Sequence, residues 1–166
     1  MIRLSLFGPV SLRADGREIR IRSLKLRAML GYLALSDSRS ETRERIVGLL
    51  WSESEETQAR AVLRQVIRET REILSGFGAP AVRISPYDIG FEPGVLEVDV
   101  FDVVRAAEAG EVHPLLLDRP HLSDDLMAGL EDLDSAFRVW LLAKRHSLRD
   151  RVSSAATVWD RIEATA

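Results

Sequence analysis

The sequence predicts an α+β fold, because strand-like segments at both ends of its first hundred residues enclose three helical segments. Residues 3–7, 10–13 and 18–22 alternate apolar and polar side chains, a pattern typical of strands with one buried face. Apolar residues then recur at helical spacing, and a second hairpin pattern follows them. The rest of the 166-residue chain has helical spacing. We therefore expect residues 1–100 to form one domain and residues 101–166 a helical unit.

The first strands are predicted to form a small antiparallel sheet. Gly8-Pro9 interrupts the first run, since proline cannot donate to a strand ladder. Asp15-Gly16 is a hairpin turn signal, and Ile19 and Ile21 lie on one face of the strand that follows.

Two helices are predicted next. The first covers Leu24–Leu35, with Ser23 as its N-cap and Lys25 in its first turn. A cation there opposes the helix dipole, so its presence favours an anionic partner. The second helix covers Thr42–Trp51 and is expected to begin at Ser40 or Glu41.

The third helix, Thr57–Leu74, carries a line of arginines. They stand at spacings of i, i+4, i+8 and i+11, on a stripe roughly 80° wide: Arg60, Arg64, Arg68 and Arg71. The apolar residues lie on another face, so one side can pack while the other presents guanidinium groups that bond bidentately to phosphates and base edges. Ser52 with Glu55, or Ser54, is expected to cap this helix.

A second hairpin follows the third helix. Ser75–Pro80 is a break, and short extended runs at Val82–Ile84 and Ile89–Phe91 flank a tip at residues 85–88. Residues 95–98 alternate as a further strand. Three helices followed by a hairpin is the order of a winged helix-turn-helix, whose third helix enters the major groove.

The C-terminal part is predicted to be helical. We expect a helix over Val100–Ala109, an irregular stretch over residues 111–120, a short helix capped by Ser123, and a long helix from Ser135. Its inward residues, together with the other tryptophans, are predicted to be core: Trp51, Phe137, Trp140, Leu141, Leu148, Val152 and Trp159.

Composition describes an ordinary globular protein with an uneven charge distribution. Hydrophobic residues make up 46% of the chain and charged residues 30%, cysteine is absent, and no apolar run approaches a membrane span. With no signal-peptide core at the start, we expect a cytoplasmic protein without membrane contact. Residues 1–100 hold 15 Arg and Lys against 14 Asp and Glu, and residues 101–166 hold 8 against 12. Any DNA affinity must therefore come from local clustering.

The ordered segments resemble the N-terminal portion of AfsR-like antibiotic regulatory proteins. These join an OmpR/PhoB-type winged helix to a helical, TPR-like bacterial transcriptional activation domain. The resemblance rests on residues 2–35, 42–51, 59–74, Gly90-Phe91, 98–107, 127–137 and 140–152. The third helix departs from the family where Glu69 and Thr70 stand in place of basic and then leucine residues, and Glu72 adds another negative charge.

The resemblance implies a sequence-specific transcriptional regulator that binds double-stranded DNA. Its third helix would lie in the major groove and its wing on the minor groove, with contacts from Lys25, Arg43, Thr57, Gln58, Arg60, Ala61, Arg64, Arg68, Arg71, Arg83, Ser85 and Tyr87. The loop over Trp51, Ser52, Glu53, Ser54, Glu55 and Glu56 resembles the segment that contacts RNA polymerase, and a homodimer on repeated half-sites is the family expectation.

Two alternatives belong to other classes. An enzyme would have to use His113, His121 and Asp124-Asp125, which lack a nucleophile, a phosphate loop or metal-ligand spacing. We therefore predict no enzyme activity, no cofactor and no metal. The stronger rival is a winged helix used as a protein–protein interaction module without DNA binding, which the acidic C-terminal part and the carboxylates of the third helix favour.

Overall fold

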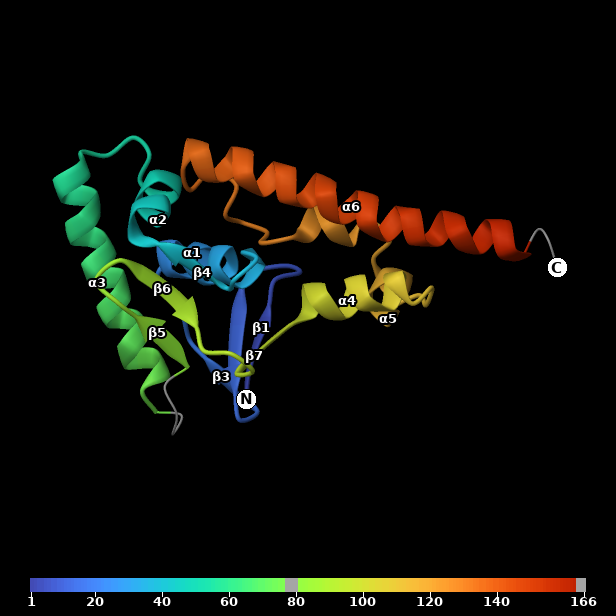
Figure 1. Cartoon of the computed structure of the whole chain (residues 1–166), viewed down its shortest axis with the longest axis horizontal. Coiled ribbons are helices and arrows are strands. Elements are labelled where there is room, and N and C mark those ends of the chain that lie inside the picture. Colours follow the sequence, from blue (N-terminus) through green and yellow to red (C-terminus); the bar gives the residue numbers. More distant parts are fainter. Residues whose placement is uncertain (77–80, 164–166) are drawn as a thin grey trace.

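Strands and helices alternate in a mixed α+β architecture (Figure 1). The computed structural model describes residues 1–76 and 81–163, with side chains described through Ser153. The strands of this part are β1 (Ile2–Ser5), β2 (Ser11–Ala14), β3 (Arg17–Ile19), β4 (Ser40–Thr42), β5 (Val82–Ile84), β6 (Asp88–Phe91) and β7 (Leu96–Val98). Its helices are α1 (Leu24–Leu35), α2 (Arg43–Leu50), α3 (Glu56–Leu74), α4 (Asp99–Glu108), α5 (Pro114–Asp118), the 3-10 helix η1 (Leu122–Asp125) and α6 (Ser135–Glu163).

The predicted N-terminal sheet is confirmed, and it gains a fourth strand. β1, β2 and β3 are antiparallel neighbours, and Asp15 and Gly16 form the β2–β3 turn with φ values of 49° and 77°. Positive φ at both positions defines the type I′ turn that Asp-Gly favours. The strand expected at residues 95–98 is β7, which returns to this sheet parallel to β1. The three helices and the wing supply the long crossover that a parallel pair requires.

The first two helices follow the predicted pattern except at the start of α2. The Ser23 hydroxyl accepts a hydrogen bond from the Leu26 amide at 3.1 Å, as expected of an N-cap. The second helix does not begin at Ser40 or Glu41, because Ser40–Thr42 forms strand β4. Thr42 ends this strand and caps α2 through its hydroxyl, which accepts from the Arg45 amide.

The wing is a three-stranded sheet in the order β4-β6-β5. β6 lies between the hairpin partner β5 and the short strand β4, to which it pairs with Gly90 opposite Ser40. This approach requires glycine, because a Cβ on residue 90 would lie 2.3 Å from the Ser40 Cβ. β4 therefore anchors the wing to the start of α2. The predicted break at Ser75–Pro80 lies partly outside the described residues.

The C-terminal helices pack directly against the winged helix. α4 begins immediately after β7 and contacts β1, and α6 runs from α2 past α4 (Figure 1). Two expectations were wrong: residues 114–118 form the short helix α5, and Ser123 lies inside η1 instead of capping a helix. Proline at the first position of α5 suits a helix start, because its missing N–H would have no partner there.

One hydrophobic core extends across residue 100. Phe137, Leu141 and Leu148 of α6 are buried as predicted, while Trp140 and Val152 pack partly buried at its edge. Trp51 is also buried, and the side chain of Trp159 lies outside the described residues. In the part of the chain that the structure covers, no helix combines the length and apolar character needed to span a bilayer.

Candidate nucleic-acid interface

Helix α3 separates an apolar face from a charged one, as its sequence predicted. Its buried residues face the core: Ala59, Leu63, Val66, Ile67, Thr70 and Leu74. The Thr70 hydroxyl donates to the Val66 carbonyl at 2.8 Å, so its polar group is satisfied within the helix. The four predicted arginines, and the predicted base-contacting residues Thr57, Gln58 and Ala61, are all exposed. The arginines and these residues of the first turns of α3 are therefore exposed to solvent.

The N-terminus of α3 is capped by Glu55, and the predicted caps Ser52 and Ser54 were wrong. The Glu55 carboxylate accepts hydrogen bonds from the amides of Thr57 and Gln58, both at 2.9 Å. These bonds lower the pKa of Glu55 below its usual value. A carboxylate at this position also interacts favourably with the helix dipole.

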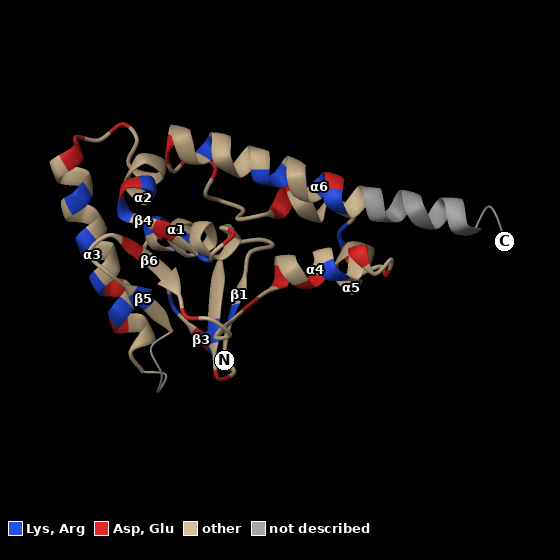
Figure 2. Ribbon diagram, in the orientation of Figure 1, with Lys and Arg blue, Asp and Glu red and all other residues tan. Residues whose placement is uncertain are grey.

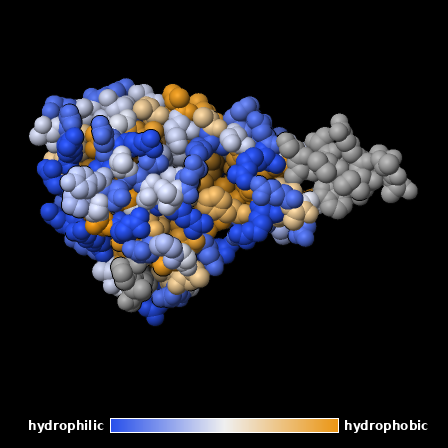
Figure 3. All heavy atoms as spheres, in the orientation of Figure 1, coloured by the Kyte–Doolittle hydropathy of each residue, from blue (hydrophilic) through white to orange (hydrophobic). Residues whose placement is uncertain are grey.

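The arginines of α3 differ in the partners they have inside the chain. Arg60 forms an ion pair with Glu56 at 2.6 Å, and Arg68 donates to the Gln65 side chain at 3.3 Å. Within the described residues, no carboxylate lies within 4.0 Å of the charged groups of Arg64, Arg68 or Arg71. Figure 2 shows these basic positions following one another along α3, with acidic residues at its start and near its end. In the same view, mostly hydrophilic side chains cover the region of α3 (Figure 3).

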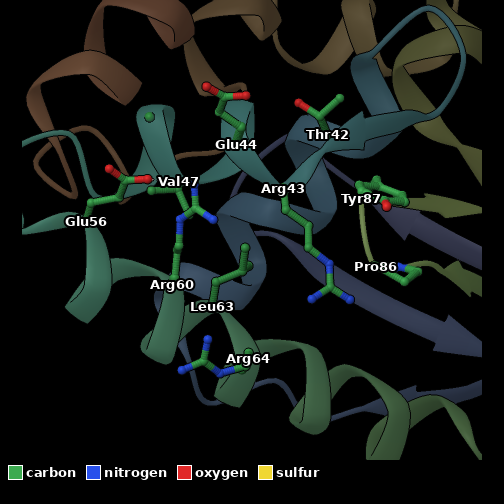
Figure 4. A pocket seen from close by; sticks show the side chains of 11 residues that line it. Thr42, Arg43, Glu44, Val47, Glu56, Arg60, Leu63, Arg64, Pro86 and Tyr87 are labelled. Atoms are coloured by element: carbon green, nitrogen blue, oxygen red, sulfur yellow. Dashed lines mark hydrogen bonds and ion pairs between the residues drawn. The ribbon is translucent and has the colours of Figure 1, made fainter.

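A concave surface of about 550 Å³ brings the predicted site residues of three elements together (Figure 4). Arg43 comes from α2, Arg60 and Arg64 from α3, and Tyr87 from the turn between β5 and β6. Leu63 and Val47 contribute apolar surface to its wall. The remaining lining residues were not predicted as DNA contacts, and Glu56 among them was predicted only as part of the RNA polymerase-contacting loop: Thr42, Glu44, Gly48, Glu56 and Pro86.

Arg43 joins α2 to the wing. Its amide donates to the Tyr87 carbonyl at 2.8 Å and its Nη2 donates to the Ser85 carbonyl at 2.6 Å. The Nε atom is buried and has no hydrogen-bond partner in the structure. Arg43 therefore holds the wing turn beside α2, while its side chain lines the concave surface.

The wing turn presents Tyr87 and Arg83 but uses Ser85 internally. The Ser85 hydroxyl donates to Asp88 Oδ1 at 2.6 Å and accepts from the amides of Tyr87 and Asp88. Tyr87 is 81% exposed, and Arg83 is exposed on β5. The hydroxyl of Ser85 therefore shapes the tip, Tyr87 is exposed at the tip, and Arg83 is exposed on the strand that leads to it.

Lys25 lies away from these residues and has an internal role. Its ammonium group donates to the carbonyls of Leu50 and Leu133 and lies 5.2 Å from the centroid of the Trp51 ring. Burial lowers the pKa of Lys25, and the nearby Asp134 carboxylate partly opposes this. The cation in the first turn of α1 thus interacts with the C-terminal end of α2, where a helix dipole favours positive charge. The predicted anionic partner is not needed to explain it.

Part of the loop between α2 and α3, where RNA polymerase contact was predicted, bonds to residues at the start of α6. Trp51 is buried, and both the amide and the hydroxyl of Ser52 bond to Asp134, just before α6. Glu53 accepts from the Ser135 hydroxyl at 2.9 Å. Ser54, Glu55 and Glu56 are exposed.

The fold defines the class of this protein as a winged helix-turn-helix followed by an all-α segment. This class is recognised here by three helices, a wing anchored by β4, and an arginine-lined face on the third helix. Regulatory protein AfsR of Streptomyces coelicolor is 29% identical to the chain over 133 residues, which cover 78% of this chain and 13% of AfsR. The solved structure of Mycobacterium tuberculosis EmbR in complex with a low affinity phosphopeptide superposes with a TM-score of 0.60 and 21% identity. That match covers 94% of this chain and 44% of the EmbR chain.

These likenesses confirm the resemblance to AfsR-like proteins and the predicted fold. No protein family model matches the chain. The chain spans only about an eighth of AfsR and less than half of the EmbR chain.

Proposed function

We propose that this chain is a non-enzymatic transcriptional regulator that binds double-stranded DNA in a sequence-specific manner. The concave surface that unites Arg43, Arg60, Arg64 and Tyr87 carries the proposal. Guanidinium groups suit phosphates and guanine edges, and here they come from the third helix and from the helix that precedes it. The similarity to AfsR, which is named a regulatory protein, supports the same function.

In this arrangement the N-terminal half of α3 enters the major groove and the wing lies on the minor groove. Thr57, Gln58 and Ala61 occupy the exposed first turns, where base contacts of recognition helices concentrate. Glu69 is half-buried and Glu72 exposed near the other end of the helix. Their negative charge disfavours contact with phosphates at that end of the helix. Residues 57–68 are therefore the part of α3 that we place in the major groove.

Salt dependence of DNA binding tests the proposal. Four to six phosphate contacts predict that log affinity falls with log salt at a slope of about −4 to −5. Fluorescence anisotropy with random duplex at about 50 mM salt measures non-specific affinity, and selection from a random duplex library then supplies a preferred site. An affinity that did not change with salt, or no binding at low salt, would exclude DNA as the partner of this surface.

Arg64→Ala tests the face itself. We expect binding to the preferred site to weaken by about 1–3 kcal/mol if Arg64 contacts a base. Arg105→Ala is the matched control, because Arg105 is 78% exposed on α4 and its removal changes the net charge equally. Equal losses in the two variants would show that only overall charge matters.

Protein binding without DNA is the second candidate. Glu44 and Glu56 line the same concave surface, and Glu56 already pairs with Arg60. A partner protein with mixed charge would fit such a lining. Failure to bind duplex at low salt, where non-specific binding is strongest, would favour this function.

The finer organisation of the regulator is also proposed from the resemblance. We place the winged helix at residues 1–100 and the first helices of the activation domain at residues 101–166. A homodimer would bind repeated half-sites, and residues 51–56 would contact RNA polymerase through their exposed part, Ser54–Glu56.

A further inference from the structure

The carboxylate of Asp134, the residue just before α6, bonds to the loop that precedes α3. Asp134 Oδ2 accepts from the Ser52 amide at 2.9 Å, and Oδ1 accepts from the Ser52 hydroxyl at 2.6 Å. Asp134 Oδ1 also accepts from the Ala136 amide at 2.9 Å. Both carboxylate oxygens are therefore used, and the same group caps α6 and fixes the loop.

Two further contacts surround this connection. Glu53 accepts from the Ser135 hydroxyl, and Lys25 bonds to the carbonyls of Leu50 at the end of α2 and Leu133 before α6. The loop is thus held from α1 and from the approach to α6. Hydrogen bonds to charged groups are stronger than those between neutral groups, so this contact resists opening more than an ordinary loop contact does.

The fixed loop ends at the cap of the proposed recognition helix. Glu55, three residues after Ser52, bonds to the amides of Thr57 and Gln58. We propose that Asp134 is a positioning residue for DNA recognition: by holding Ser52 it sets the place of the first turn of α3 relative to the wing. This inference rests on the proposed DNA binding, and it makes the start of α6 part of the DNA-binding unit through its contact with Ser52.

The positioning role and the loss of negative charge predict opposite changes in DNA affinity when Asp134 is replaced. Removal of an acidic residue should by itself strengthen binding to DNA, since it raises the net positive charge. Asp132→Ala is the control, because Asp132 is 86% exposed and its side chain forms an ion pair with Arg138 but no bond to the loop before α3 among the described residues. We expect that control to bind equally or slightly more tightly. We expect Asp134→Ala and Ser52→Ala to bind DNA about 3- to 10-fold more weakly, because each loses the charge-assisted bond between the Ser52 hydroxyl and Asp134. Ser52→Ala should lie at the lower end of this range, since it keeps the bond from its amide.

The salt slope separates positioning from contact. Asp134→Ala should keep the wild-type slope, because no phosphate contact is removed, whereas loss of a phosphate-binding arginine lowers the slope by about 0.9. The Asp134→Ala and Ser52→Ala double variant should be no weaker than Asp134→Ala alone, since both changes break one connection. Unchanged affinity in Asp134→Ala, or additive losses, would overturn the inference.

Hydrogen exchange on the free protein provides a readout that does not need DNA. In Asp134→Ala, the amides of Ser52, Thr57 and Gln58 should exchange faster, while those in the last turns of α3 should not change. Unchanged exchange at Thr57 and Gln58 would refute the positioning role. A wild-type chain that bound no DNA would refute the proposed function instead, so the two failures can be told apart.

Discussion

The buried carboxylate of Asp99 should be the most costly polar group to remove. Asp99 is 7% exposed at the start of α4, and it accepts hydrogen bonds from the amides of Leu6 and Phe7 at 2.9–3.2 Å. These amides lie just beyond the end of β1, where the strand no longer pairs with β2. Asp99 thus joins the N-terminal sheet to the C-terminal helices.

The expected cost follows from the groups left behind. Asp99→Ala removes the acceptor of three backbone N–H groups, those of Leu6, Phe7 and Val100, and each unsatisfied buried donor costs about 1–3 kcal/mol. The desolvation of the carboxylate offsets part of this loss, so we expect the free energy of unfolding to fall by about 3 kcal/mol. For a chain of this size that corresponds to about 6–12 °C in Tm. Urea unfolding followed by circular dichroism measures the change.

Asp102→Ala is the control, since Asp102 lies three residues further along the same helix. Its side chain is 35% exposed and pairs with Arg3 at 3.4 Å and with Arg105 at 3.6 Å, so its loss should cost less than about 1 kcal/mol. Equal losses in the two variants would refute the role given to the Asp99 bonds.

The pH dependence gives a second check on Asp99. Burial raises the pKa of Asp99, although the backbone N–H bonds oppose it. A raised folded-state pKa contributes stability that is present at low pH and lost as pH rises through that value. The loss of unfolding free energy caused by Asp99→Ala should therefore become smaller as pH rises from the unfolded-state pKa, about 4, through the raised folded-state pKa.

Three further predictions concern single contacts. Gly90→Ala should lower the free energy of unfolding by about 1–3 kcal/mol, because the new Cβ would meet Ser40. Gly48→Ala is the control: its Cβ would meet nothing within 4 Å, so the free energy of unfolding should stay the same or rise by up to about 1 kcal/mol. Urea unfolding measures both changes. Burial would raise the pKa of Asp134, but the hydrogen bonds that its carboxylate accepts outweigh burial and lower this pKa. The contribution of Asp134 to stability is therefore complete above its unfolded-state pKa and is lost as pH falls through its folded-state pKa. An NMR titration that gave Asp134 an ordinary pKa would contradict this. Thr70→Val should change stability by less than about 1 kcal/mol, because the hydroxyl bonds only within α3, and a larger loss would reveal another role for it.

Local signals in the sequence predicted most of the elements. Ser23 caps α1 as expected, and Asp15-Gly16 forms the β2–β3 turn. These signals act within a few residues, so the sequence around them is sufficient. The apolar face of α3 is equally local, since its period alone separates buried from exposed positions.

Pairings between distant segments could not be predicted in the same way. β4 depends on Gly90, fifty residues after Ser40, and β7 pairs with β1 across the whole winged helix. Neither run of three residues carries enough pattern to identify its partner. The small residue opposite Ser40 is the one local clue, and it becomes meaningful only when the register is known.

The sequence predicted the part of the candidate site that lies on one helix. It did not predict the contacts that join several elements around the site. The arginine stripe is a property of α3 alone. The Arg43 contact with the wing turn, the internal bonds of Lys25 and the capture of Ser52 by Asp134 each join separate elements. Ser52 matches an N-cap pattern in the sequence, but its bonds to Asp134 leave Glu55 to cap α3.

The carboxylates near the concave surface weaken the proposed DNA binding without preventing it. Glu56 and Arg60 are exposed by 70% and 58%, and an exposed pair one helical turn apart is worth only about 0.3–0.5 kcal/mol. A single phosphate contact gains about 3.5-fold in affinity when salt falls from about 200 to 50 mM, or about 0.7 kcal/mol, by counterion release. We therefore expect a DNA phosphate to compete with Glu56 for Arg60 at low salt. Arg64 has no competing carboxylate among the described residues, so it should carry more of the affinity as salt rises.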